Sequence, residues 1–112
     1  MINDWFKEID AAVTVCNRAG IIVYMNERSA KMFADDGGYD LLGKNLLDCH
    51  PGASADKVKQ LLDEPQTNCY SIEKHGQHKL IYQVPWWENG LFSGLVEFSL
   101  PLPADIPHFL RE

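Results

Sequence analysis

Runs of alternating apolar residues, separated by glycine-containing turns, constrain the fold of this chain more than any other feature. The first two runs are joined by Arg18-Ala19-Gly20, and the last three by Gly76 and by Glu88-Asn89-Gly90. Asn-Gly between two such runs is typical of a tight β-hairpin, because both positions need a positive φ. The pattern predicts five antiparallel strands, at residues 11–17, 21–26, 67–74, 78–86 and 91–100.

A short amphipathic helix is predicted over residues 2–9, before the first strand. Its apolar residues follow an i, i+3, i+4, i+7 pattern, namely Ile2, Trp5, Phe6 and Ile9. So short a helix is marginal alone and must lean on an apolar surface. We therefore expect these residues, together with the outward ring of the Trp86-Trp87 pair, assigned to Trp87, to form an interface between two copies of the chain. The alternative is that the helix covers the outer sheet face within its own chain.

A helical block separates the two groups of strands. Asn26 is expected to cap a helix over residues 27–34, and Ser54 a longer helix that ends near Glu64. Single-turn helices are predicted between them, over residues 39–52. This order predicts an α+β fold, in which a five-stranded antiparallel sheet has helices packed on one face.

Composition excludes several classes of protein. The chain has 112 residues, which suits one domain over 1–112, and a net charge of −6, which disfavours nucleic acids and anionic lipid surfaces. It contains neither an apolar run long enough to cross a membrane nor a signal-peptide pattern, so we expect a cytoplasmic protein. The three Cys residues are widely spaced, which indicates free thiols.

Three stretches together resemble the PAS family of sensor modules. The stretch VTVCNRAGIIVYMNERSAKMF (13–33) resembles the PAS opening: a strand, a glycine turn, a strand ending in Asn, and a helix. The stretch YDLLGKNLLDCHP (39–51) resembles the segment that follows, and WENGLFSGLVEFS (87–99) the closing hairpin. The resemblance covers the core, residues 10–100. The stretch LLDCHPGASADKVKQLL (46–62) is also similar to the Cys-His-Pro type of bacterial and archaeal PAS module.

The resemblance implies a sensory or protein-interaction domain without catalysis of its own. PAS modules bind a small molecule or cofactor between the sheet and the helices, or bind nothing and mediate dimerisation. By this reasoning, we expect an interior suited to a small apolar or amphipathic ligand. The residues expected to line it are Tyr24, Phe33, Leu46, His50, Val58, Leu62, Tyr70, Leu80, Tyr82 and Val96.

The C-terminal tail departs from the family pattern. PAS domains commonly end their last strand in an Asp-Ile-Thr-like sequence that opens into a coiled coil, whereas this chain continues with Pro101 and Pro103. Proline lacks the backbone donor of a strand or helix, so residues 101–112 are expected to leave the sheet without an exit helix. Signalling through a separate partner protein, or simple ligand binding, is what this leaves.

The cofactor expectations rest on few residues. His50 could bind haem iron, although a histidine before Pro51-Gly52 is more typical of a helix end. Flavin is not expected, because the reactive-cysteine motif of light-sensing PAS modules is missing and Val96 occupies the position of a polar flavin contact. His75 and His78 flank a turn without further metal ligands nearby in sequence, which favours solvated turn residues and no metal site. The ligand, if any, stays unidentified.

Two other classes of protein remain open. One is a small cone-shaped α+β enzyme of the ketosteroid-isomerase type, which needs a buried acid or base in its cavity. The strand pattern places no carboxylate inward, because Glu73 and Glu97 are both expected to face outward. The other is a purely structural dimerisation module with a filled core.

Overall fold

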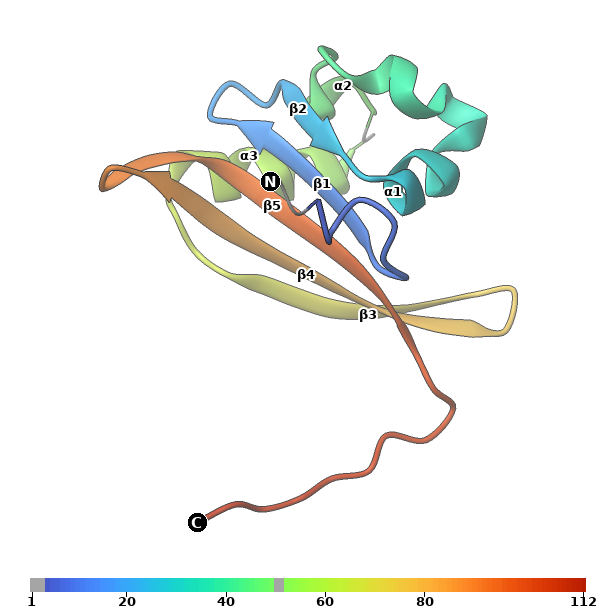
Figure 1. The fold of residues 1–112 in the computed structure, drawn as a ribbon. Coiled ribbons are helices and arrows are strands. Elements are labelled where there is room, and N and C mark those ends of the chain that lie inside the picture. Colours follow the sequence, from blue (N-terminus) through green and yellow to red (C-terminus); the bar gives the residue numbers. More distant parts are fainter. Residues whose placement is uncertain (1–3, 50–51) are drawn as a thin grey trace.

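A single antiparallel sheet organises the molecule in the computed structural model, which describes residues 4–49 and 52–112 (Figure 1). Its strand order is β2-β1-β5-β4-β3, so β1 and β5 join the two hairpin blocks at the centre. The strands are β1 (Ala12–Asn17), β2 (Ile22–Met25), β3 (Asn68–Lys74), β4 (Gln77–Glu88) and β5 (Leu91–Leu102).

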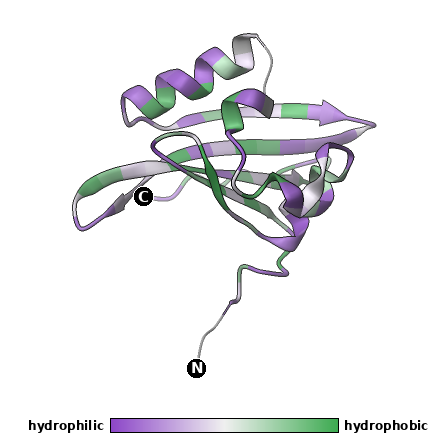
Figure 2. Ribbon diagram, turned by 90° about the horizontal axis from the view of Figure 1, so that it is seen from above, coloured by the Kyte–Doolittle hydropathy of each residue, from purple (hydrophilic) through white to green (hydrophobic). Residues whose placement is uncertain are grey.

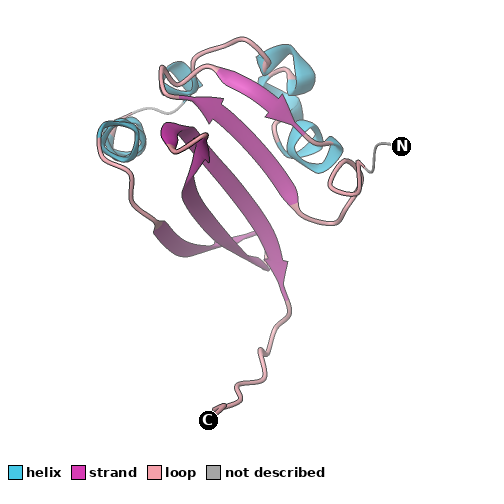
Figure 3. Cartoon of the chain, turned by 60° about the vertical axis from the view of Figure 1, so that its left-hand side comes forward, coloured by secondary structure: helices cyan, strands magenta, loops and turns pink. Residues whose placement is uncertain are grey.

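The helical block lies on one side of this sheet (Figure 3), which confirms the predicted α+β fold. It comprises α1 (Glu27–Met32), two 3-10 turns, η1 (Ala34–Asp36) and η2 (Gly38–Leu41), then α2 (Leu46–Cys49) and α3 (Ala53–Asp63). Asn26 caps α1 as expected, with the Ser29 N–H donating to its Oδ1 at 3.0 Å. α3 begins one residue before the predicted cap, Ser54, and no side chain caps it.

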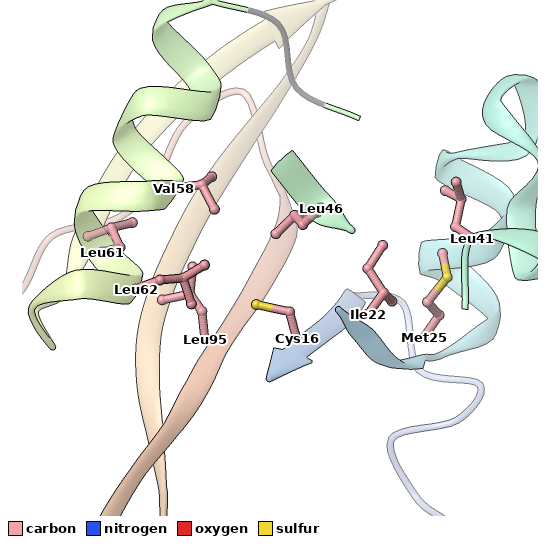
Figure 4. Close-up of a cluster of buried hydrophobic side chains, with 9 residues drawn as sticks. All are labelled: Cys16, Ile22, Met25, Leu41, Leu46, Val58, Leu61, Leu62 and Leu95. Atoms are coloured by element: carbon pink, nitrogen blue, oxygen red, sulfur yellow. The ribbon is translucent and has the colours of Figure 1, made fainter. Parts of the chain in front are cut away.

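Buried side chains fill the space between α3, the sheet and α2 (Figure 4). Leu61 of α3 and Cys16 of β1 are at most 1% exposed. The cluster consists of Cys16, Ile22, Met25, Leu41, Leu46, Val58, Leu61, Leu62 and Leu95. Hydrophobic residues also recur along the long strands outside this cluster (Figure 2).

The strand register defines the two faces. Cys16 lies opposite Leu95, and both pack in the core, so every second residue counted from this pair faces the helices as well. We call this the inner face; its members include Ala12, Thr14, Cys16, Asn68, Tyr70, Ile81, Gln83, Leu95, Glu97 and Ser99. The outer face carries Val13, Val15, Tyr24, Leu80, Tyr82, Val84, Val96, Phe98 and Leu100.

The helix predicted over residues 2–9 is wrong for its described part, because residues 4–11 form a turn and bends. The buried Asn26 side chain explains the difference. Its Nδ2 donates to the carbonyl oxygens of Phe6 and Ala11, both at 2.8 Å, and the Glu27 N–H donates to the Lys7 carbonyl at 3.0 Å. A helix over residues 2–9 would leave the Phe6 and Lys7 carbonyls without an intrahelical partner, so these bonds do not compete with helical ones. So short a helix is marginal on its own, and the contacts with Asn26 and Glu27 hold the segment in bends along the fold.

The expectation that the chain leaves the sheet at Pro101 is also wrong, because β5 continues to Leu102. Pro101 pairs with Lys79 of β4, whereas the pairing of β5 with β1 ends at Ser99. Pro85 of β4 likewise stands beyond the end of β3, whose last pair is Asn68–Gln83. At both positions one side of the strand has no partner, and a proline there need not remove a ladder hydrogen bond.

Gly94 marks a close approach within the sheet. Its φ is +149°, and a Cβ at this position would lie 2.0 Å from the Cys16 carbonyl oxygen. The Trp86 indole Nε1 donates to that same oxygen at 2.9 Å. A neighbouring strand and an indole ring therefore occupy the space where a side chain at this position would lie.

Candidate functional site on the inner face of the sheet

A row of polar side chains crosses the inner face from β3 to β1. Asn68, Gln83, Glu97 and Thr14 lie opposite one another on four successive strands. The Asn68 Nδ2 donates to Gln83 Oε1 at 2.7 Å, and the Gln83 Nε2 donates to Glu97 Oε1 at 2.6 Å. We call these four residues the polar row.

The polar row continues into the helical layer. The Thr14 and Ser29 hydroxyls share a hydrogen bond of 2.5 Å, which links β1 to α1. Thr14 and Gln83 are each 4% exposed, and Ser29 is fully buried. Hydrogen-bonded groups in such surroundings hold each other in place, because a polar group that loses its partner there has no water to replace it.

Glu97 supplies the negative charge of this face and affects two neighbours. Burial raises the pKa of the Tyr70 phenol, and the Glu97 charge raises it further. Burial also raises the pKa of the Cys16 thiol; a backbone hydrogen bond from Leu95 lowers it, and Glu97 raises it again. Both groups therefore stay protonated near neutral pH, so the Cys16 thiol is a weak nucleophile.

Ser99 adds a second polar feature next to the row. It is 4% exposed, and its Oγ is buried without a hydrogen-bond partner among the described residues. Its strand neighbours on the inner face are Ala12 and Ile81, which offer no side-chain acceptor. An unpartnered buried hydroxyl is uncommon in folded proteins and points to a missing partner.

Five of the predicted lining residues lie on the helical side of the sheet. Leu46, Val58 and Leu62 belong to the buried core, and Phe33 packs against it. Tyr70 lies on the inner face and is 45% exposed. Their contact with a ligand stays a prediction, and His50 lies outside the described residues.

Tyr24, Leu80, Tyr82 and Val96 do not line that interior, contrary to the prediction. The register places them on the outer face, because they alternate with residues that face the core. Glu97, predicted to face outward, faces inward instead. The argument against flavin from Val96 is therefore wrong, since the inner position of β5 belongs to Glu97, and so is the argument that no carboxylate faces inward.

The predicted interface residues are partly placed. Trp5 is 71% exposed, and Phe6 packs edge-on against Tyr24 with ring centroids 5.3 Å apart. Ile9 is half-buried, and Ile2 lies outside the described residues. Trp87 is 53% exposed and contacts Phe92.

The two adjacent tryptophans share one face. A register shift between Trp86 and Trp87 places them opposite Gly94 and Phe92, which both lie on the outer face. One ring was expected to point inward and the other outward. A β-bulge at this point cancels the alternation, so both indoles belong to the outer face.

Metal ligands do not gather anywhere in the described part of the chain, where three or more His, Cys, Asp or Glu side chains never cluster. His78 instead lies 3.5 Å from Glu73, at the exposed end of the β3–β4 hairpin. Within the same residues, every helix is too short or too polar to cross a membrane.

Sequence reasoning missed Asn68, Gln83, Glu97, Thr14 and Ser99 as site residues. The signal was present, since Glu97 and Ser99 alternate with apolar residues on β5, as Gln83 does on β4. Alternation shows which residues share a face, but the more apolar set was assumed to face the helices. The structure reverses that assumption.

Neither a protein-family model nor a curated protein matches the sequence. Solved structures do match. The Aer2 receptor of Vibrio cholerae, described as a dual PAS-haem oxygen sensor, aligns at a TM-score of 0.61 and 16% identity over 83% of this chain and 95% of that one. A sensory box histidine kinase of the same organism aligns at 0.63 and 20% identity over 91% and 89%.

The PAS domain of the histidine kinase ThkA aligns as well, at a TM-score of 0.64 and 16% identity over 81% of this chain and 98% of that one. Alignments at these TM-scores establish the fold, whereas identities this low do not identify a ligand. The strand order, the helical layer and these alignments agree: the chain has the fold of a PAS domain.

Proposed function

We propose that this chain is a sensory domain that binds a small polar molecule against its inner face and signals to another protein. The observation that carries the proposal is the polar row, which places a carboxylate and two carboxamides beneath the helical layer. Binding sites combine an apolar lining with a few fixed polar groups in this way, and the core residues around Leu46 and Val58 supply that lining. The fold shared with receptor and kinase PAS domains supports a sensory role.

The chemistry of the row favours a ligand that donates hydrogen bonds. Glu97 Oε1 already accepts from Gln83, and among the described residues no donor is bonded to its second oxygen. An amine or amide group would suit that oxygen, whereas the wholly apolar ligand expected from the sequence would leave it unpaired. Haem fits less well, because its macrocycle would press against the carboxylate and amides at the centre of the face.

Native mass spectrometry of the purified chain tests this function. We expect a noncovalent passenger on the wild-type protein and at least about tenfold less on Glu97→Gln, because hydrogen bonds to a charged group are the stronger kind. Glu73→Gln, an equal change on the exposed outer side of β3, is the control and should retain it. A passenger carried equally by both variants would contradict the proposal, as would a Soret band in the absorbance spectrum.

The inward carboxylate also revives the enzyme alternative, and proton NMR of the released passenger separates it from binding, because an isomerase changes the structure of its ligand without changing the mass. A sensory domain returns its ligand unchanged, so the passenger spectrum should be the same before and after incubation with the wild-type chain. Conversion to a second spectrum, which Glu97→Gln added to the same passenger solution does not produce, would favour an acid–base enzyme instead.

We further propose that the outer face mediates homodimerisation. Its central strands carry Leu80, Tyr82, Val84, Val96 and Phe98, without a charged side chain between them. Two copies of an acidic chain repel each other in general, and an uncharged apolar patch is where that repulsion is weakest. Trp5, Phe6, Ile9 and Trp87 border this patch in the proposal, and Ile2, which was predicted to join them, lies outside the described residues.

Sedimentation of paired substitutions tests the dimer. Tyr82→Lys should convert a dimer to a monomer, because it places a charge in the apolar patch, whereas Ile72→Lys on the inner face of β3 is the matched control and should leave the mass unchanged. The double substitution Trp5→Glu and Phe6→Glu tests the N-terminal segment, because an unchanged sedimentation coefficient would exclude that segment from the dimer contact. A wild-type monomer would exclude the dimer altogether.

The C-terminal segment bears on how the signal leaves the domain. Residues 103–112 extend away from the sheet without a helix (Figure 1), and in the proposal the signal passes to a separate partner protein in the cytoplasm. The relationship to the Cys-His-Pro type of PAS module stays a prediction, since His50 and Pro51 lie outside the described residues.

A further inference from the structure

A small pocket of about 60 Å³ lies at the end of the inner face where β1 begins and β5 leaves the sheet. Its walls come from α1 and from the strand ends, and include Asp10, Arg28, Met32, Lys79, Ser99 and Pro101. None of the residues of the polar row lines it. The pocket is therefore a different site from the one to which the proposed sensory function is assigned.

The pocket is positively charged within an acidic chain. Arg28 and Lys79 each bring one positive charge, and Asp10 brings one negative charge. The Asp10 carboxylate lies 2.8 Å from the Arg28 guanidinium, which offsets one of the cations. Lys79 has no ion pair among the residues that the structure describes, so its charge is left for a further anion.

Ser99 gives this pocket a buried donor. Its Oγ is the buried atom without a hydrogen-bond partner among the described residues, and the residue is only 4% exposed. A hydroxyl rotates to donate to whatever acceptor occupies the pocket. A buried donor beside an unpaired cation is the arrangement that recognises an oxyanion.

We propose that this pocket binds a small carboxylate. One carboxylate oxygen accepts a hydrogen bond from the Ser99 hydroxyl, and the Lys79 ammonium and Arg28 guanidinium balance the charge. One uncompensated positive charge matches a monocarboxylate better than a doubly charged phosphate. A volume of about 60 Å³ holds several water molecules' worth of ligand, which is enough for a carboxylate group and its first carbon atoms.

Binding here would connect segments that are distant in sequence. Asp10 lies where the chain enters the sheet, Ser99 and Pro101 lie where it leaves, and Arg28 belongs to α1. A carboxylate bound among them contacts both α1 and the C-terminal end of β5. The pocket therefore places an anion where the two ends of the folded core meet.

Titration of the ¹⁵N-labelled chain with sodium acetate, exchanged against sodium chloride at constant ionic strength, tests the proposal. We expect saturable shifts of the backbone amides of Arg28, Lys79 and Ser99 and their neighbours. Lys79→Met and Ser99→Ala should each weaken acetate binding by about tenfold or more, because each removes a charge-assisted contact. Ser99→Ala removes a hydroxyl without a partner, so the fold should be retained.

Lys59→Met and Ser71→Ala are the matched controls, because they remove the same groups from exposed positions outside the pocket. Both should bind acetate as the wild type does. Shifts that grow linearly without saturation would overturn the proposal, as would equal binding by Lys79→Met and Lys59→Met. Tighter binding of inorganic phosphate than of acetate would overturn the assignment to a carboxylate.

Discussion

The two faces of one sheet differ in an unusual direction. On the inner face Thr14 and Gln83 are each 4% exposed, whereas on the outer face Tyr82 is 39% and Trp87 53% exposed. The chain thus buries the hydroxyl and amide groups of Thr14 and Gln83 on the inner face and leaves the rings of Tyr82 and Trp87 partly exposed on the outer one. A buried polar row is tolerable only when its groups are hydrogen-bonded, and an exposed apolar face is most stable when something covers it. The difference indicates two kinds of contact, a polar ligand inside and a protein outside.

The largest expected loss of stability comes from a substitution of Gly94, over which the Trp86 indole reaches the Cys16 carbonyl oxygen. Gly94→Val should cost at least about 4 kcal/mol of unfolding free energy, because the side chain would meet the Cys16 carbonyl and force β1 from β5. Gly76→Ala has a φ of +77° but no atom within 4 Å, and should cost only about 1–2 kcal/mol. Urea denaturation measures both, and equal losses would show that the close approach does not matter.

Packing in the buried core should matter more than an apolar side chain at the exposed end of the β4–β5 hairpin. Leu61→Ala removes a side chain with 0% exposure and should cost about 3 kcal/mol, because α3 cannot close the cavity. Leu91→Ala makes the same change at 72% exposure and should cost less than about 0.5 kcal/mol. Thermal or urea denaturation of the pair checks the contrast, which similar losses would break.

Asn26 connects β1, α1 and the segment before β1, and its substitution offers a third test. Asn26→Ala should cost about 2–3 kcal/mol, because it leaves the backbone groups of Val13 and Ser29 and the carbonyls of Phe6 and Ala11 without their partner. Asn26→Asp retains the acceptor and loses the donors. Hydrogen exchange should then show α1 still protected and the segment around Phe6 released; release of both would assign the effect to general unfolding.

The smallest effect concerns Tyr70. Its folded pKa is raised above the ordinary value of 10.0 by burial and by Glu97, so the unfolded chain ionises first as the pH rises. The contribution to stability is therefore complete below pH 10 and is lost as the pH climbs through and above that value. Glu97→Gln should lower the ultraviolet titration midpoint of this phenol, identified by its loss in Tyr70→Phe. An unchanged midpoint would separate Tyr70 from Glu97.

Much of the fold could be predicted from the sequence, because local rules govern it. Asn89-Gly90 makes the expected hairpin with φ values of 52° and 82°, and Asn26 caps the expected helix. The predicted N-terminal helix does not form, because so short a helix is marginal on its own and contacts with Asn26 and Glu27 hold the segment in bends. A contact between residues so far apart in sequence leaves no trace in apolar spacing.

The site was less predictable for a physical reason. Alternation on β5 separates Glu97 from Val96 correctly, but it does not state which set meets the helices. The usual assumption, that apolar residues face inward, reverses β4 and β5 here. Recognising a site-forming carboxylate required the strand register, which only the folded chain supplies.

Val96 and Glu97 are neighbours on β5 that point to opposite faces, and they test the account most directly. Native mass spectrometry reads the bound passenger and the oligomeric mass in one spectrum. The account predicts that Glu97→Gln loses the passenger and remains a dimer, whereas Val96→Lys becomes a monomer and keeps the passenger. If both substitutions changed the same property, or if each changed the property assigned to the other face, the division of labour between the two faces would be wrong.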